Sequence, residues 1–128
     1  MKMTSGGFEI LRKQFGVLEQ SFVDGVNLVV DESEKQGLEY NQTAYVLATA
    51  YHESAGTFLP VKEAYWLSEN WRKNNLRYYP YYGRGLVQLT WDYNYLKAGE
   101  NLGYDTQFVN NPDMVMQQDI SVKILVLG

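Results

Sequence analysis

The chain has 128 residues, a length that suits one compact domain and leaves little room for a second. Its formal net charge of −4 provides no basic surface of the kind that holds nucleic acid phosphates, and no apolar run is long enough to cross a bilayer. The lack of cysteine excludes disulfides and thiol nucleophiles, and a single histidine excludes a multi-histidine metal site. We therefore expect no nucleic acid or membrane partner, no metal and no organic cofactor.

The organisation of the chain is simple. It contains no internal repeat, low-complexity tract or linker, so we expect residues 1–128 to form a single domain. Residues 1–7 lack the basic and then apolar pattern of a secretory signal peptide. We expect the protein to be made and kept in the cytoplasm until it is released to its substrate.

Apolar residues recur at helical spacing over residues 8–15 and again over residues 18–36, which predicts two helices. Gly16 and Gly37 are natural stops for them. The positions expected to form the apolar stripes are Phe8, Leu11 and Phe15 in the first helix and Leu18, Phe22, Val26, Val29 and Val30 in the second. The residues of the second helix expected to face water are Glu19, Asp24, Glu32, Glu34 and Lys35.

A third helix is predicted from Asn41, a suitable N-cap, to Glu53 in its last turn. Counting back by helical steps places Ala50 and Val46 on the same face as Glu53. Apolar surroundings and the negative end of the helix dipole both favour an uncharged carboxyl there, as a general acid requires. Gly56 then suits the left-handed conformation that often follows a helix.

A second carboxyl, Glu63, follows Pro60 in a segment that is not expected to continue the helix, so it can fold back to face Glu53 across a cleft. Paired carboxyls of this kind cleave glycosidic bonds. A separation of about 6.5–9.5 Å leaves room for a water and gives inversion, whereas about 5–5.5 Å makes the second carboxylate a nucleophile. The alternative is a surface glutamate beside Lys62.

Aromatic residues form 15% of the chain, with 11 Tyr and 3 Trp, and they crowd between residues 65 and 95. Flat rings pack against the apolar faces of sugars while their polar tips form hydrogen bonds, so this crowding favours a carbohydrate surface. The alternative for any single ring is a place in a tyrosine-rich core. Within this region, residues 86–89 are the place where we expect a small β element.

Several motifs resemble glycoside hydrolase family 19, the family of chitinases and related phage endolysins. The resemblance lies in their order and spacing together and covers most of the chain from about residue 18. The matching segments are residues 47–53, 60–63, 81–91, 94–95, 97–103 and 111–113. The resemblance implies a lysozyme-like, mainly α-helical fold.

The same resemblance implies that Glu53 is the general acid and that Glu63 is the general base activating a water, with inversion in a single displacement. The positions that match substrate-binding residues of the cleft are Tyr82, Gln88, Thr90, Trp91 and Asn94. Amide side chains can donate to and accept from the hydroxyl and N-acetyl groups of a sugar. For Thr90 and Trp91, a packing role is an equal alternative.

Two further residues are expected to be structural. Residues 83–85 lack the spacing and the lysine of a phosphate-binding loop, so we interpret them as a tight turn that inserts Arg84 against carboxylates. His52 adjoins Glu53, but successive helical residues point about 100° apart. We therefore expect His52 to be a hydrogen-bonded structural residue rather than a catalytic one.

The chain departs from the family pattern in two places. Related chains continue beyond residue 128, and the apolar helix expected at residues 120–128 must be buried, against the second helix or by a partner chain. A missing cleft wall would put activity in doubt. Residues 64–80 do not align with the family pattern and are interpreted as a loop over the cleft that sets substrate choice.

The function expected from the sequence is hydrolysis of β-1,4 bonds in an N-acetylated polysaccharide, peptidoglycan or chitin, with peptidoglycan favoured by analogy with phage lysis enzymes. Two alternatives are open. A non-catalytic glycan-binding or assembly module would keep the cleft without turnover. A lytic transglycosylase would need only Glu53 and would release an anhydro-sugar. The sequence does not indicate an oligomeric state.

Overall fold

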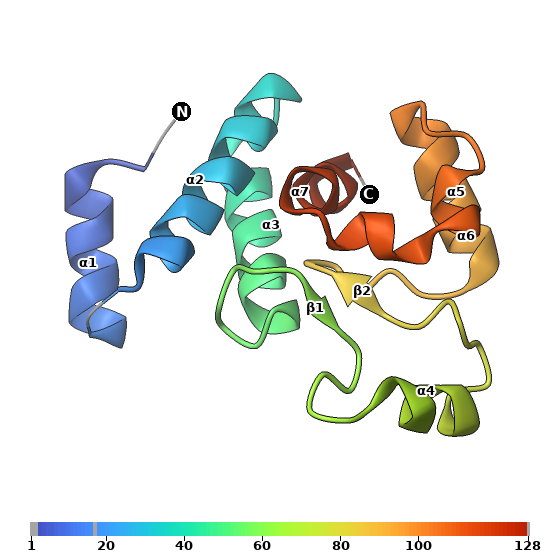
Figure 1. Cartoon of the computed structure of the whole chain (residues 1–128). Coiled ribbons are helices and arrows are strands. Elements are labelled where there is room, and N and C mark those ends of the chain that lie inside the picture. The colour runs from blue at the N-terminus through green and yellow to red at the C-terminus, as the bar shows by residue number, and fades with distance from the viewer. Residues whose placement is uncertain (1–2, 17, 128) are drawn as a thin grey trace.

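The computed structural model describes residues 3–16 and 18–127 and is mainly α-helical, which confirms the predicted fold class (Figure 1). The helices are α1 (Ser5–Phe15), α2 (Gln20–Lys35), α3 (Tyr40–Glu53), α4 (Glu69–Asn75), α5 (Asp92–Leu102), α6 (Gln107–Asn110), η1 (Pro112–Met116) and α7 (Gln118–Leu127), and the strands are β1 (Val61–Lys62) and β2 (Arg84–Gly85). Within the described ranges, no helix combines the length and the apolar character needed to cross a membrane.

Helix α7 lies at the centre of this arrangement, with α2 and α3 on one side and α5 and α6 on the other (Figure 1). Its residues contribute to two apolar cores, which explains why its sequence is so apolar. The first core contains Phe8, Phe22, Val26, Val29, Val30, Ala50, Phe58, Leu86, Val122, Leu125 and Val126, and the second contains Tyr95, Phe108, Val115, Ile120 and Ile124. The expected burial of this helix against α2 is confirmed, and Gly128 lies outside the described residues.

Local signals explain most helix ends. Thr4 caps α1 by accepting a hydrogen bond from Gly7 N at 3.0 Å, and Gly16 ends it with a φ of 84°, as predicted. The predicted cap of α3 at Asn41 is wrong. The helix begins at Tyr40 because Glu39 and Gln42 form a reciprocal capping box, in which Glu39 N donates to Gln42 Oε1 at 2.9 Å.

Two expectations about exposure are also wrong. Glu32 was expected to face water, but it is only 8% exposed, because α2 is covered by both α3 and α7. Its carboxylate is satisfied by a hydrogen bond from Gln36 Nε2 at 2.8 Å. Phe15, expected in the buried stripe of the first helix, is 49% exposed because it lies at the C-terminal end of α1.

The small sheet differs from the expected β element at residues 86–89. It pairs β1 with β2 in antiparallel register, Val61 with Gly85 and Lys62 with Arg84, and Leu89 forms only an isolated bridge to Arg84. The chain leaves the direction of β2 at Gly85, which has a φ of 86°. The next amide, Leu86 N, donates to Ser121 Oγ of α7 at 2.7 Å instead of to a strand.

Candidate active site

The side chain of Glu53 projects from the C-terminal end of α3 and is partly exposed. Within the described chain, its carboxylate forms no hydrogen bond or ion pair. The turn that follows is well fixed, because Ser54 Oγ accepts a hydrogen bond from Phe58 N at 2.9 Å in the interior. Gly56 has a φ of 80°, the left-handed conformation predicted for it. Glu53 is therefore held by its backbone, while its carboxyl is free to meet a ligand.

Glu63 follows β1 directly and is held by its carboxylate as well as by its backbone. Gly83 N donates to Glu63 Oε1 at 2.9 Å, and the Tyr78 hydroxyl donates to Glu63 Oε2. The alternative of a surface glutamate beside Lys62 does not describe this geometry. Lys62 is paired instead with Asp113, at 3.2 Å from Nζ to Oδ1.

A buried arginine of α4 anchors the chain immediately around Glu63. Arg72 is 5% exposed and donates from Nε to Glu63 O at 2.7 Å and from Nη2 to Ala64 O at 2.9 Å. Two donors of one planar guanidinium therefore fix two successive carbonyl groups. This contact ties the loop that carries Glu63 to α4.

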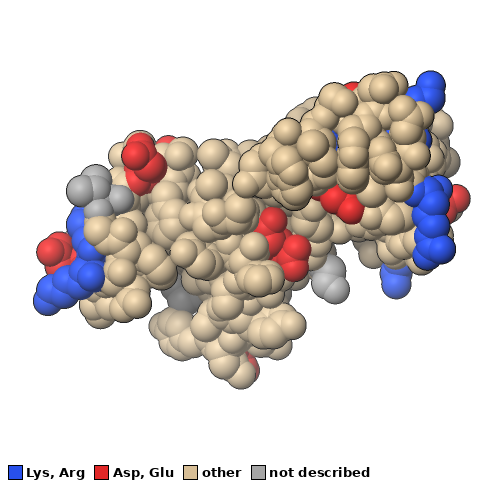
Figure 2. Space-filling model, turned by 90° about the horizontal axis from the view of Figure 1, so that it is seen from below, with Lys and Arg blue, Asp and Glu red and all other residues tan. Residues whose placement is uncertain are grey.

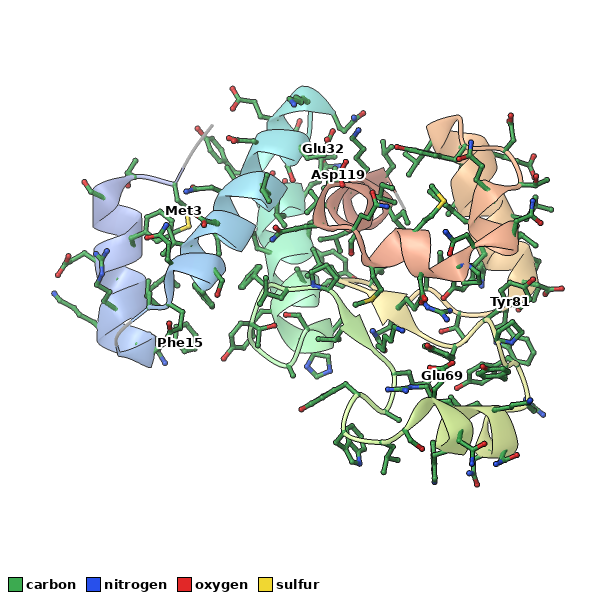
Figure 3. The ribbon with its side chains drawn as sticks, viewed as in Figure 1. Met3, Phe15, Glu32, Glu69, Tyr81 and Asp119 are labelled. Carbon is green, nitrogen blue, oxygen red and sulfur yellow. The ribbon has the colours of Figure 1, made fainter. Side chains whose placement is uncertain are left out.

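Tyr82 was expected to bind substrate, but its side chain is fully buried and offers no surface to a sugar. The guanidinium groups of Arg84 and Arg72 lie over its ring, at 3.8 Å and 5.2 Å from the centroid. Its hydroxyl donates to Glu69 Oε1 at 2.9 Å, and Figure 3 places Glu69 between α4 and β2. Tyr82 therefore supports the site from inside.

Arg84 is inserted into the interior, as we predicted from the tight turn at residues 83–85. It pairs with one carboxylate rather than with several. Its Nε donates to Asp113 Oδ1 at 3.0 Å, and its Nη1 donates to Pro80 O at 2.8 Å and to the Tyr95 hydroxyl at 3.0 Å. The Tyr95 hydroxyl then donates to Tyr82 O at 2.5 Å. The network fixes both ends of the segment that carries Gly83.

These contacts shift several pKa values. Partial burial opposes the charged form of Asp113, but Lys62 and Arg84 outweigh it and lower the pKa of Asp113. Burial, partly offset by Arg84, raises the pKa of Tyr95 to about 12. Burial and then the hydrogen bond to Glu63 raise the pKa of Tyr78 to about 12. Both phenols are therefore uncharged donors at neutral pH.

Three of the five expected substrate-binding residues form a chain of internal hydrogen bonds. Gln88 Nε2 donates to Val61 O at 2.8 Å and to Gly85 O at 3.1 Å. Thr90 Oγ1 donates to Gln88 O and Asn94 Nδ2 donates to Thr90 O, both at 2.9 Å. Their donors are used to shape the loop, and the amide oxygens of Gln88 and Asn94 accept no hydrogen bond from a described residue.

Trp91 lies in an aromatic group beside Glu63. Its ring centroid is 5.1 Å from that of Tyr78 and 6.2 Å from that of Tyr93, and it is nearly parallel to Tyr93, with 17° between the planes. The guanidinium of Arg77 lies 5.5 Å from the Trp91 centroid. Trp91 is partly exposed and Tyr93 is 61% exposed, so this group presents flat rings to solvent.

His52 does not have the hydrogen-bonded role expected of it. Its side chain is exposed on α3 and forms no hydrogen bond with a described residue. The reason is the geometry of the last helical turn, which points His52 away from the packed face that contains Ala50.

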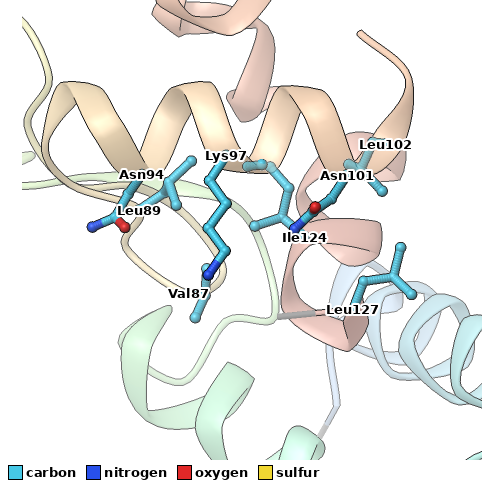
Figure 4. A pocket seen from close by; sticks show the side chains of 9 residues that line it. Val87, Leu89, Asn94, Lys97, Asn101, Leu102, Ile124 and Leu127 are labelled. Carbon is cyan, nitrogen blue, oxygen red and sulfur yellow. The ribbon is translucent and has the colours of Figure 1, made fainter. Parts of the chain in front are cut away.

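A cavity of about 440 Å³ lies between α5 and α7 (Figure 4). Asn94, Lys97 and Asn101 line it from α5, opposite Ile124 and Leu127. Its lining includes neither Glu53 nor Glu63, so we place the candidate active site by the chemistry of the carboxyls rather than by this cavity. Within the described ranges, no group of three or more His, Asp or Glu side chains is arranged to hold a metal ion.

Four functional contacts of this site were not predicted from the sequence. They involve Tyr78, Arg72, Glu69 and Asp113. The sequence shows a tyrosine-rich run at residues 78–82 and a polar segment at residues 111–113, and both indicate functional side chains. Neither indicates which residue each side chain contacts, because those partners lie far away in the sequence.

The described chain is mainly helical, has one small two-stranded sheet and carries Glu53 and Glu63 on segments that follow one another in the sequence. Residues 37–126 match the family model of glycoside hydrolase family 19, described as chitinase class I. The chain belongs to this family.

Curated relatives match only a short stretch. Chitinase 11 of Oryza sativa subsp. japonica is 56% identical over 41 residues, which is 32% of this chain and 15% of that protein. Inactive chitinase-like protein 1 of Hevea brasiliensis is 57% identical over 35 residues, 27% of this chain and 10% of that protein. The acidic 26 kDa endochitinase of Solanum lycopersicum is 50% identical over 40 residues, 31% of this chain and 16% of that protein.

Solved structures match over nearly the whole chain. Chitinase C from Streptomyces griseus HUT6037 has a TM-score of 0.56 and 25% identity, covering 98% of this chain and 56% of that one. A bacterial family 19 chitinase has a TM-score of 0.58 and 25% identity, covering 91% of this chain and 63% of that one. The chain therefore spans less than two thirds of these chitinases.

Proposed function

We propose that this chain carries the acid/base centre of a glycoside hydrolase that cleaves β-1,4 bonds beside N-acetylated sugars. The observation that carries the proposal is the contrast between the two carboxyls. Glu53 has no described partner, so its carboxyl is free to meet the glycosidic oxygen. Glu63 accepts hydrogen bonds from Gly83 and Tyr78, which hold its carboxylate in one orientation.

The roles follow from these settings. Glu53 donates its proton to the glycosidic oxygen as the bond to the anomeric carbon breaks. Glu63 takes a proton from a water that attacks the anomeric carbon from the opposite face, and the configuration is inverted. The reaction leaves Glu53 charged and Glu63 protonated, and exchange of one proton with solvent restores both. No cofactor takes part in these steps.

Chitin is the substrate class that we propose first. The relatives from Oryza sativa and Solanum lycopersicum are named a chitinase and an endochitinase, and the family model is described as chitinase class I. On the face shown in Figure 2, a few acidic and basic side chains lie among many uncharged ones, as suits a neutral polymer. Trp91 and Tyr93 offer rings to the apolar faces of sugars, and Gln88 and Asn94 offer free amide oxygens.

The backbone around these residues supports a binding role. Gln88 and Trp91 have φ values of 53° and 75°, a conformation that non-glycine residues rarely adopt. Such backbone strain is concentrated at functional sites. Peptidoglycan contains the same β-1,4 linkage beside N-acetylated sugars and is the second substrate that we propose.

One observation favours a second candidate, a non-catalytic glycan-binding module. One of the relatives with high identity, that of Hevea brasiliensis, is named an inactive chitinase-like protein. Such a module would bind oligosaccharides in the same cleft and release no product.

The test is mass spectrometry of soluble products after the purified chain is incubated separately with chitin hexasaccharide and with peptidoglycan. Shorter sugars that carry one added water support the hydrolase and identify its substrate. Products that lack this water indicate a lytic transglycosylase. Saccharide binding without any product supports the second candidate.

A further inference from the structure

The Tyr78 hydroxyl connects the proposed base to the aromatic group beside it. Its hydroxyl donates to Glu63 Oε2, while its ring contacts Trp91 at 5.1 Å between centroids. Tyr78 lies within residues 64–80, the segment interpreted from the sequence as a loop over the cleft, and the match to the family model includes this segment. It is partly buried, and its pKa near 12 keeps the phenol protonated at any pH at which the protein would act.

The second oxygen of Glu63 is fixed independently. Gly83 N donates to Oε1 at 2.9 Å, and this amide belongs to the segment that β2 and Arg84 hold in place. A Cβ at Gly83 would lie 2.7 Å from Gln88 Oε1 and 3.3 Å from Glu63 Cβ, so a side chain there would displace the Gln88 amide. One donor on each oxygen therefore prevents the carboxylate from rotating.

An ionised carboxylate has about four lone-pair positions, of which Tyr78 and Gly83 occupy two. The remaining positions can accept a hydrogen bond from a water, as a general base must. Two donors thus orient the carboxylate without using its whole capacity to accept.

We propose that Tyr78 is a positioning residue for Glu63: its hydroxyl holds the carboxylate in the orientation in which it accepts a proton from the attacking water. This inference rests on the proposed function, since it gives Tyr78 a role in that reaction. Tyr78 acts through Glu63 and does not itself exchange a proton.

The main test compares Tyr78→Phe with Tyr79→Phe on whichever substrate the wild-type chain cleaves. Tyr78→Phe keeps the ring against Trp91 and removes only the donor to Glu63. Tyr79→Phe is the matched control, because the Tyr79 hydroxyl interacts with Glu69 of α4 and not with Glu63. Losing a hydrogen bond to a charged group predicts about a tenfold or greater fall in kcat for Tyr78→Phe, with KM changed less than about twofold.

The split between kcat and KM separates positioning from a merely structural role. Loss of the donor to Glu63 in Tyr78→Phe lowers kcat while KM stays nearly unchanged, because the missing hydroxyl orients the carboxylate and does not hold the sugar. The kcat and KM of Tyr79→Phe match those of the wild type. Equal kcat values for Tyr78→Phe and the wild type overturn the inference.

A double-mutant cycle of thermal stability tests the contact without any substrate. Tyr78→Phe, Glu63→Ala and the double variant are melted under the same conditions, and a direct hydrogen bond predicts shifts in melting temperature that are not additive. Additive shifts overturn the inference. If the cycle shows coupling but the wild type releases no product from either polymer, the proposed function fails, and with it the catalytic role of Tyr78, while the Tyr78 contact with Glu63 stands.

Discussion

Glu63 and Gly83 are joined by a reciprocal pair of backbone and side-chain hydrogen bonds. Glu63 N donates to Gly83 O at 2.7 Å, and Gly83 N donates back to the carboxylate oxygen Glu63 Oε1 at 2.9 Å. The pair continues the ladder of Lys62 with Arg84 by one step. The Glu63 carboxylate is therefore bonded to Gly83, the residue that also pairs with the Glu63 backbone. The position of this carboxylate thus depends on the small sheet.

Replacing the two carboxyls with alanine should affect stability very differently. Glu63→Ala leaves the Gly83 amide without its acceptor, so we expect the free energy of unfolding to fall by about 1–3 kcal/mol. Glu53→Ala removes no described contact, so we expect the free energy of unfolding to change by less than about 0.5 kcal/mol. Urea denaturation measures both. Equal losses of unfolding free energy in the two variants would show that Glu63 is held no more firmly than Glu53.

Removing the buried guanidinium of Arg84 should be costly. Arg84→Ala removes a buried guanidinium whose Nη1 donates to the Tyr95 hydroxyl and to Pro80 O, and we expect the free energy of unfolding to fall by about 2–4 kcal/mol. The control is Arg12→Ala, because the ion pair of Arg12 with Glu9 is exposed on α1 and should contribute less than about 0.5 kcal/mol. Denaturation curves that place both variants within about 0.5 kcal/mol of the wild type would contradict this account of the network.

The Asp113 carboxylate should make stability depend on pH in acid. Its pKa is lowered in the folded state below the ordinary value of 3.8, so its contribution is present above that value and is lost as pH falls through the folded pKa. The melting temperatures of the wild type and Asp113→Asn should therefore differ at pH 6 and converge in strong acid. A difference that stays constant from pH 6 to pH 2 would rule out this linkage.

Gln88→Ala tests a residue to which the sequence assigned substrate binding and the structure assigns internal hydrogen bonds. Its amide donates to Val61 O and Gly85 O, so we expect the variant to lose about 1–2 kcal/mol of stability in addition to any rise in KM. Gln20→Ala is the matched control, because Gln20 bonds only Asp24 on the exposed face of α2. A rise in KM with unchanged stability would leave Gln88 as a binding residue alone.

The parts of the fold that were predictable are local. Helical spacing located α1, α2 and α3, and counting turns placed Glu53 in the last turn of α3. The start of α3 was missed because Asn41 is a common cap by residue type, whereas the capping box of Glu39 and Gln42 depends on two side chains together.

The parts that were not predictable depend on distant contacts. Tyr82 matched a cleft position, yet Arg72 of α4 and the nearby Arg84 lie over its ring, which is fully buried. The tie between Tyr78 and Glu63 joins residues fifteen positions apart, and neither helical nor strand periodicity relates them. Residue type alone does not distinguish a tyrosine of the cleft from one of the core.

The central claim is that Glu53 and Glu63 act together as acid and base in one inverting displacement. The measurement that tests it most directly is time-resolved proton NMR of the anomeric signals released from chitin hexasaccharide by the wild type, Glu53→Gln and Glu63→Gln. We predict that the wild type releases the α-anomer first and that each substitution lowers the rate at least about a hundredfold. Release of the β-anomer first, or a wild-type rate in either variant, would contradict the account.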